Sequence, residues 1–302
     1  VDDAQNLTRL EMTLSHGTNT TFGYGVTAGN LNSFSITDGN TQSLGMAVSG
    51  AMDFVYSVDR ALSLSTIDAG TSTTGSISLT SRSAPTGTGA QINRSSGSLT
   101  GGTVTLSATG FNGGVGAGAT LSTNTKNLSI ASGGNVSISN STTLTSLNLD
   151  ARHNTSGSST HSYSISSTGL TFSISDTLGN NAFQLANISQ SGLDLSVKAD
   201  RVITASSVNT GAGGKVTLNS GSYIQGGSGA NAGSPSITTG DLTLNGGSAF
   251  GYQGSTPLYT AASTLSSSLT NTLYLSNAGA LTLKTNTVAG SADVASSNNS
   301  LL

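Results

Sequence analysis

The sequence predicts an all-β protein of the parallel β-helix class, a β-solenoid whose coils contain about 23 residues each. Three observations lead to this prediction. Short runs of alternating apolar and small polar residues recur along the chain. Neighbouring runs are separated by a similar number of residues, and the composition is rich in Gly and poor in charge.

The recurring run has the order apolar, small polar, apolar, which is typical of a strand with one buried face. No segment longer than a few residues keeps the period of an amphipathic helix, so we expect strands throughout. The runs occupy residues 62–64, 77–79, 104–106, 128–130, 136–138, 147–149, 170–172, 193–195, 216–218, 242–244, 273–275 and 281–283.

The spacing of the runs indicates stacked coils. The runs that start at Ile77, Val104 and Leu128 are separated by similar but unequal intervals, which a coil with tolerated insertions explains. Four starts in the middle of the chain share a constant interval of about 23 residues, so we expect them to form inward columns. The first predicted column contains Leu147, Leu170, Leu193 and Val216, and the second contains Leu149, Phe172, Leu195 and Leu218.

The composition fits such a stack. Charged residues make up 8% of the chain, against about 25% in an average soluble domain. Like charges repeated every ~4.8 Å along a solenoid would repel one another, so small polar residues are expected on the outer faces. A hydrophobic content of 34% and a net charge of −3 favour an ordered chain over a disordered one.

Several classes of function are disfavoured by the sequence. The ten Lys and Arg residues are spread thinly and form no basic patch, so we expect no nucleic-acid partner. No apolar stretch approaches the roughly 18 residues of a membrane-spanning helix, and we do not expect the chain to be embedded in a membrane. The absence of Cys excludes disulfides and Cys-ligated metal sites.

We expect three parts in the chain. Residues 1–60 are more charged and keep the repeat poorly, which indicates an irregular N-terminal part of the solenoid or an added layer. Residues 61–290 form the β-helix repeat region, and residues 291–302 are a frayed end or the start of the next coil. The chain begins at Val1 without a signal peptide, so we expect it to be an excised or processed segment.

Three segments carry a resemblance to a known group: GSLTGGTVTLSATGFNGG (97–114), KNLSIASGGNVSISNS (126–141) and NAGALTLKTNTVAGS (277–291). They resemble the repeat regions of filamentous-haemagglutinin-like exoproteins, the large adhesins of two-partner secretion systems in Gram-negative bacteria. The resemblance covers roughly residues 61–290 and rests on repeat style and composition, which autotransporter passengers share. It implies a right-handed β-helix that is exported through an outer-membrane β-barrel transporter partner. It also implies a secreted protein on the bacterial cell surface or in the extracellular matrix, with a role in adhesion, aggregation or biofilm formation.

Charged residues are more frequent between residues 150 and 201, and four of them form a candidate glycan-contact face: Asp150, Arg152, Asp194 and Lys198. In the predicted columns, Arg152, Ser175 and Lys198 align, and the two aspartates share an outer face. Carboxylates on neighbouring coils could reach the roughly 5–10 Å separation that glycoside hydrolysis requires. This pattern keeps a polysaccharide-binding or polysaccharide-cleaving β-helix open as an alternative.

Other candidate residues indicate no specific chemistry. His153 and His161 flank a Ser-rich loop, where we expect exposed histidines rather than a catalytic group. Tyr residues such as Tyr223 and Tyr252 could stack on sugars, but they occur singly in the sequence, so we expect ordinary surface residues. The Gly-rich run 226–229 lacks the Asp of calcium-binding solenoid repeats. We therefore predict no catalytic residues, no cofactor and no metal site.

These observations predict a structural or adhesive segment of a large secreted surface protein rather than an enzyme. The expected partners are a host-cell or matrix polysaccharide, another glycan or a surface receptor, and self-association is a further expectation. A protein that forms surface lattices or filaments is the remaining alternative.

Overall fold

The computed structural model describes residues 8–14, 23–24, 31–37, 41–48, 50–82, 90–109, 113–151, 161–170, 173–177 and 182–297. These residues form strands and one short 3-10 helix, η2 (Tyr252–Gly254). The chain divides into two compact units. Unit 1 comprises residues 1–144, 153–157 and 164–168, and unit 2 comprises residues 145–152, 158–163 and 169–302.

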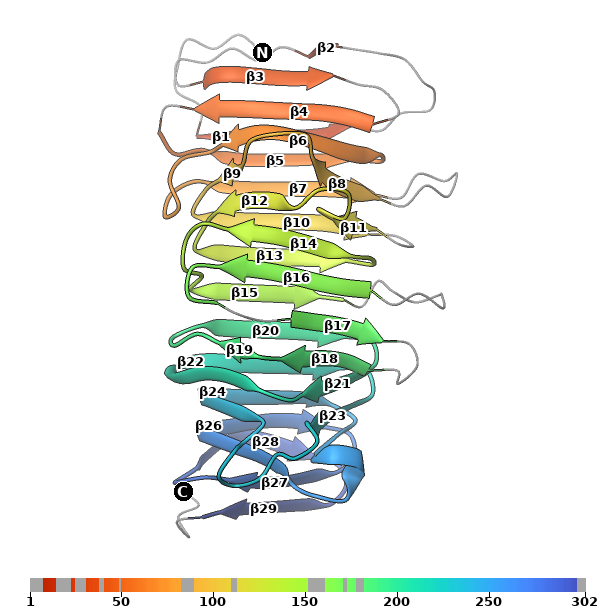
Figure 1. The fold of residues 1–302 in the computed structure, drawn as a ribbon, viewed down its shortest axis with the longest axis vertical. Helices are drawn as coiled ribbons and strands as arrows, with labels where there is room; N and C mark the ends of the chain where they lie inside the picture. The colour runs from red at the N-terminus through yellow and green to blue at the C-terminus, as the bar shows by residue number, and fades with distance from the viewer. Residues whose placement is uncertain are drawn as a thin grey trace. The chain divides into compact units, whose positions relative to one another are not determined.

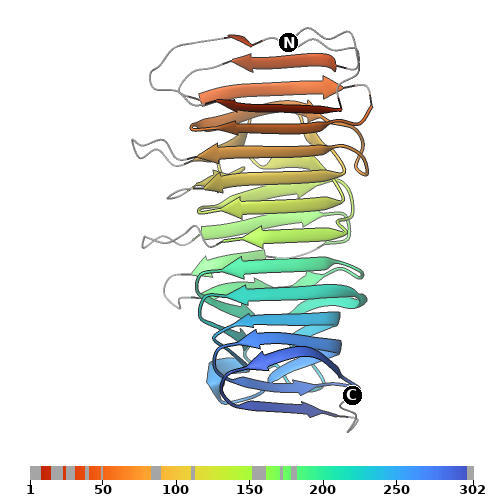
Figure 2. The same cartoon turned by 180° about the vertical axis from the view of Figure 1, so that it is seen from behind.

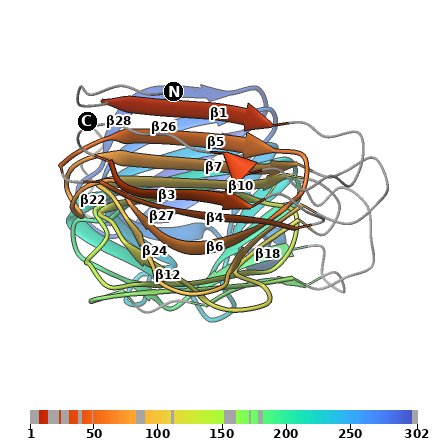
Figure 3. The same ribbon diagram turned by 90° about the horizontal axis from the view of Figure 1, so that it is seen from above.

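Unit 1 contains two sheets of parallel strands, and Figure 1 shows both of them. The first consists of β1 (Arg9–Leu14), β5 (Asp53–Val58), β7 (Ser76–Arg82), β10 (Thr103–Thr109) and β13 (Asn127–Ser132). The second consists of β4 (Thr41–Val48), β6 (Ala61–Asp68), β8 (Gln91–Arg94), β9 (Leu99–Thr100), β11 (Gly114–Val115), β12 (Leu121–Asn124) and β14 (Val136–Asn140). Seen from above, β1, β5, β7 and β10 follow one another in one stack (Figure 3).

The first part of the chain adds an antiparallel layer to unit 1. β2 (Gly23–Tyr24) pairs antiparallel with β3 (Leu31–Thr37), and β3 pairs antiparallel with β4. β1 and β5, in contrast, belong to the parallel stack. Residues before 60 therefore contribute both to the solenoid and to a layer at its end.

The core of unit 1 consists of inward side chains stacked in columns. Alternate residues of β5, β7, β10 and β13 face inward and are at most 2% exposed, and burial of each such side chain stabilises the fold by roughly 1.5–3 kcal/mol. The first column contains Phe54, Ile77, Val104 and Leu128, and the second contains Tyr56, Leu79, Leu106 and Ile130.

Tight corners join the strands. Gly75 precedes β7 with a φ of 70°, and a Cβ atom at this position would lie 1.9 Å from the carbonyl oxygen of Ala69. The corner therefore requires Gly both for its backbone conformation and for the close approach of the Ala69 carbonyl group within the same turn.

Unit 2 repeats the arrangement with its own two sheets. The first consists of β15 (Ser146–Asp150), β20 (Asp194–Ala199), β22 (Val208–Ser220), β24 (Ile237–Gly246), β26 (Leu258–Leu269) and β28 (Thr282–Val288). The second consists of β18 (Ala182–Ala186), β21 (Val202–Ala205), β23 (Tyr223–Gly226), β25 (Ser248–Phe250), β27 (Leu273–Asn277) and β29 (Ala292–Ser296).

Several strands of unit 2 bend around a corner of the coil. β19 (Ile188–Ser189) pairs with the first residues of β22, whose register against β24 then shifts between Asn209 and Lys215. The core is again apolar, and its first column contains Leu147, Leu195, Val216, Leu242 and Leu265.

Each unit is thus a parallel β-solenoid, which confirms the predicted fold class. In unit 1, β12 and β14 run to the left in Figure 1 as the chain descends, whereas β10 and β13 run to the right behind them. The view from behind shows the same order, and the coil is therefore right-handed (Figure 2). The predicted alignment of the runs at 77, 104 and 128 is confirmed, because Val104 lies beside Ile77 on one side and beside Leu128 on the other.

The predicted columns at a constant interval are wrong. Leu147 lies beside Leu195 rather than Leu170, and Leu195 rather than Leu193 lies beside Val216. β15 and β20 are direct neighbours, so the run at 170–172 does not lie between them. Part of the chain between them instead forms antiparallel pairings. β17 (Ser173–Thr177) pairs antiparallel with β18 and with β16 (His161–Ser167), whose residues are divided between the two units.

Candidate functional site

The first sheet of unit 2 carries three of the four residues of the predicted glycan-contact face. Asp150 is the last residue of β15, and Asp194 and Lys198 lie in β20. All three occupy outward positions, so the shared outer face of the two aspartates is confirmed. Arg152 lies outside the described residues.

The predicted column through Lys198 is wrong. Its neighbours are Asp150 on one side and Asn219 on the other. Ser175 pairs instead with Ser162 and Gln184 in the antiparallel strands. The physical reason is the corrected register: β15 pairs directly with β20, so the segment between them contributes no residue to this column.

The outward residues of this sheet form rows that run from strand to strand. The middle row is uncharged and contains Asn148, Ser196, Thr217, Thr243 and Ser266. A second row, which we name the charged row, lies two residues earlier in each strand. It contains Asp194, Lys215, Asp241 and Thr264, with Lys284 reaching in from β28.

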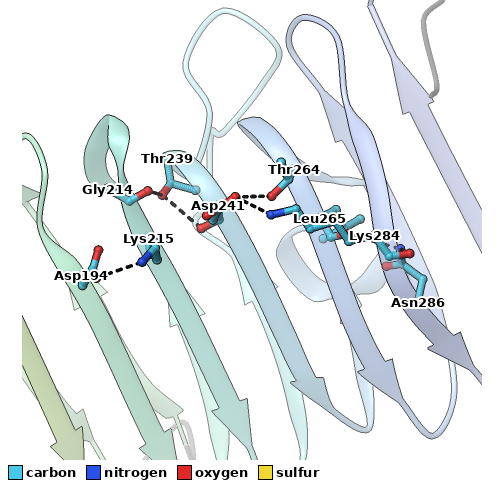
Figure 4. A network of polar contacts seen from close by, with 9 residues as sticks. All are labelled: Asp194, Gly214, Lys215, Thr239, Asp241, Thr264, Leu265, Lys284 and Asn286. Carbon is cyan, nitrogen blue, oxygen red and sulfur yellow. Dashed lines mark hydrogen bonds and ion pairs between the residues drawn. The ribbon is translucent and has the colours of Figure 1, made fainter.

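Opposite charges alternate along the charged row and pair with each other (Figure 4). The Nζ atom of Lys215 lies 3.3 Å from a carboxylate oxygen of Asp194, and that of Lys284 lies 3.0 Å from a carboxylate oxygen of Asp241. The side chains of these four residues are between 39% and 58% exposed. Solvent screens such pairs, so each contributes at most about 1 kcal/mol.

Asp241 is the most strongly held member of the row. Its carboxylate accepts hydrogen bonds from the Thr264 hydroxyl and from the Lys284 ammonium. The hydrogen bond from Thr264 makes the largest contribution to holding the pKa of Asp241 below its usual value, and the hydrogen bond from Lys284 makes the next largest. Figure 4 shows both groups converging on the same carboxylate.

This lowered pKa predicts a pH-dependent contribution to stability. A carboxyl whose pKa is lower in the folded state stabilises that state above the unfolded pKa and loses the effect as pH falls through the folded pKa. Asp241→Asn should therefore lower the free energy of unfolding by up to about 1 kcal/mol at pH 7. The difference from the wild type should shrink as the pH falls below about 4. Urea denaturation at several pH values measures it.

Asp293→Asn provides the control, because Asp293 is an exposed aspartate in β29 of the same unit. Its effect should stay within about 0.5 kcal/mol at every pH. A stability difference for Asp241→Asn that grows on acidification would contradict the role assigned to this carboxylate.

Neutral side chains support the charged row from both sides. The Thr239 hydroxyl donates to the carbonyl oxygen of Gly214 at 3.0 Å, which ties β24 to the corner of β22. The Asn245 amide donates to the Asn219 amide oxygen at 2.8 Å. Near Lys284, the Asn286 amide donates to the carbonyl oxygen of Leu265 at 3.2 Å. These contacts join successive coils by hydrogen bonds, and those of Asn245 and Asn286 lie on the outer face.

The carboxylates of this face lie beside amines rather than beside other carboxylates. The strand-to-strand neighbours of Asp150 and Asp194 are Lys198 and Lys215, not other carboxylates. A face of this kind offers hydroxyl, amide and paired charged groups to a polar ligand.

Sequence reasoning missed Lys215, Asp241 and Lys284. Two of these residues had a usable signal, because Lys215 and Asp241 directly precede Val216 and Leu242, just as Asp194 directly precedes Leu195 in the same inward column. An alignment at the constant predicted interval places Asp194 beside Thr217 instead. Lys284 reaches Asp241 across β26, and no spacing rule indicates that contact.

The expectation of an exposed loop histidine is wrong for His161. This residue lies in β16, is 4% exposed and pairs in register with Asp176. His153 lies outside the described residues.

In comparisons with known proteins, this chain matches no protein-family model, no curated protein and no solved structure. Among the described residues, no helix has the length and apolar character needed to cross a membrane. The same residues contain no group of three or more His, Asp or Glu side chains arranged to hold a metal ion.

Proposed function

We propose that this chain is a structural and adhesive segment of a large secreted bacterial surface protein, acting in attachment, aggregation or the biofilm matrix. The observation that carries the proposal is the repeated polar outer face of unit 2. Five successive strands present Asn, Ser or Thr at the same outward position, so each coil offers the same chemistry as the one before it. Repetition of this kind suits weak contacts made many times over one surface.

The solenoid architecture supports the structural part of the proposal. Successive coils contact chiefly their neighbours, and the unequal intervals between β20, β22, β24 and β26 leave the inward columns intact. Stability then accumulates from coil to coil, and a long chain can be built without a larger core.

The pairing of charges supports a role other than catalysis. The ion pairs Asp194–Lys215 and Asp241–Lys284 use the charged groups of the row within the protein itself. Polysaccharide cleavage would instead require two carboxylates that converge on one bond. Export through an outer-membrane β-barrel transporter and a location at the cell surface belong to the same proposal and rest on the repeat style of the sequence.

A display experiment tests the proposal. The full chain is presented on a non-adherent bacterium, and attachment to epithelial cells and to a polysaccharide-coated surface is counted under flow. We expect attachment to rise above that of cells presenting an unrelated β-solenoid at the same density. Attachment equal to the control would contradict the proposal, as would release of new reducing ends from polysaccharide by the purified chain.

A further inference from the structure

The outer face of the second sheet of unit 2 carries a cluster of aromatic side chains. The described residues of this unit contain five aromatic side chains that are not buried, and all five lie on or between β23, β25, β26 and β27. They are separated in the sequence, so the sequence alone gave no reason to group them. The cluster contains Tyr223, Phe250, Tyr252, Tyr259 and Tyr274.

Tyr223 and Phe250 form the centre of the cluster. Their ring centroids are 5.0 Å apart, with the ring planes inclined by 32°. Ile224 and Ala249, which alternate with them, are fully buried, so both rings are on the outer face. Gln225 lies beside Phe250 on the neighbouring strand.

The next coil extends the cluster. Ala249 pairs with Leu273, and both side chains point inward, so Phe250 and Tyr274, which follow them, project outward from neighbouring strands. Tyr259 lies beside Ser276, which is two residues beyond Tyr274 on the same face. Diagonal neighbours at this separation lie within reach of aromatic side chains.

Tyr252 lies two residues after Phe250 in the chain. It belongs to η2, in the loop between β25 and β26, and is 42% exposed. Figure 1 shows this loop as a short coiled ribbon near the C-terminal end of the chain. Among the described residues, Tyr252 and Leu283 are the only large apolar or aromatic residues that are strongly exposed to solvent.

Polar groups lie among the rings. The Gln225 amide donates to the Thr204 hydroxyl at 2.9 Å and carries a further N–H and a carbonyl oxygen. Asp293 lies beside Tyr274 on β29. The six described strands of this sheet contain no Lys or Arg, so their outward positions offer no cation to an acidic polymer.

We propose that these five aromatic residues, together with Gln225, form a binding platform for a neutral polysaccharide. The flat faces of the rings suit the apolar C–H faces of pyranose rings, and the Tyr hydroxyls and the Gln225 amide suit the sugar hydroxyls. The platform crosses three successive coils spaced by ~4.8 Å, which fits an extended chain of sugars better than a single one. The inference rests on the proposed adhesive function, and it assigns the ligand to this face rather than to the charged row.

Calorimetric titration of the full chain with cellohexaose, chitohexaose and mannohexaose tests the platform, with hexagalacturonate as the acidic counterpart. We expect at least one neutral hexasaccharide to bind, and hexagalacturonate not to bind. The double variant Tyr252→Ser/Tyr274→Thr should weaken that binding by about 10-fold or more, because each lost ring removes a stacking surface. Both substitutions are at outward positions, and thermal unfolding of the variant verifies that it remains folded.

Thr105→Ala serves as the control, because Thr105 is at an outward position of β10 in unit 1 and belongs to neither proposed surface. It should leave the affinity unchanged. No binding of any neutral hexasaccharide, equal binding by the folded double variant, or tighter binding of hexagalacturonate would overturn the platform. Loss of a dimer in the double variant, seen by sedimentation, would also overturn it by assigning the rings to a protein contact.

The display experiment remains separate: attachment that survives the double variant contradicts the platform alone, whereas sugar binding without attachment contradicts the proposed function.

Discussion

Leu195→Asp is expected to unfold unit 2. Leu195 is 1% exposed and lies between Leu147 and Val216 in an apolar column. A carboxylate at this position would be buried without a partner, and we expect a loss of more than about 4 kcal/mol in the free energy of unfolding. Circular dichroism during urea denaturation measures the effect.

Ser196→Asp is the matched control, because it places the same side chain one residue later on the outer face. Its neighbours, Asn148 and Thr217, are uncharged, and the expected change is within about 1 kcal/mol. If both variants were equally stable, or if Ser196→Asp were the more damaging one, the assignment of the inward face would be wrong.

Asn277→Ala should have the second-largest effect. The Asn277 side chain is 1% exposed and binds the backbone of the preceding coil at two points. Its amide oxygen accepts from the Ala262 N–H at 2.8 Å and its amide nitrogen donates to the Ala262 carbonyl oxygen at 3.0 Å. The Thr260 hydroxyl donates to the same amide oxygen. Removing the amide leaves these buried groups unsatisfied, and a loss of about 3 kcal/mol is expected in chemical denaturation.

Unit 1 contains the same device, which provides an independent check. The Asn140 amide accepts from the Thr125 N–H at 3.1 Å and donates to the Thr125 carbonyl oxygen at 3.0 Å. Asn140→Ala should therefore cost a similar amount. Asn245→Ala, which removes a partly exposed amide–amide contact with Asn219, should cost less than about 1 kcal/mol. Equal effects at all three positions would argue against a special role for the buried amides.

Much of the fold could be predicted from the sequence because the repeat obeys a simple physical rule. Strands with one buried face alternate apolar and polar residues. The run at Val104 could therefore be identified as a strand from the sequence, and its neighbours at Ile77 and Leu128 were predicted correctly. The intervals there are unequal, yet each alignment was correct. Insertions are accommodated in the corners, so the inward columns are kept.

The most regular interval misled the prediction. The run at 170–172 matches the strand pattern, but the described strands around it, β16, β17 and β18, pair antiparallel with one another. Leu193 is fully buried although it precedes β20. The pair Leu193 and Leu195 therefore looks like the first two inward residues of a strand. The first-column residue of β20 was consequently assigned to Leu193, two residues before its observed position at Leu195. Both strand types share the same period of two, and periodicity alone does not distinguish them.

The candidate surfaces could be predicted only in part. The sequence indicated Asp194 and Lys198, because charges are rare in this chain and these two lie near each other. The partners Lys215 and Asp241 required the correct register, and the aromatic cluster required the coils to be stacked. Tyr223 and Phe250 are far apart in the chain and meet only because their coils are neighbours.

Disulfide cross-linking between engineered cysteines tests the stacked register most directly, and the chain contains no Cys of its own. Ser196 and Thr217 are neighbours in the sheet, at the ~4.8 Å strand spacing that allows a disulfide. Asp194 and Thr217, which a constant repeat would align, are displaced along the strands by two residues, which places them beyond the ~7 Å limit. We expect the first pair of cysteines to cross-link on mild oxidation, as detected by mass spectrometry, and the second pair to remain reduced. Efficient cross-linking of the second pair without the first would contradict the register of the first sheet, and with it the outer face that carries the proposed function.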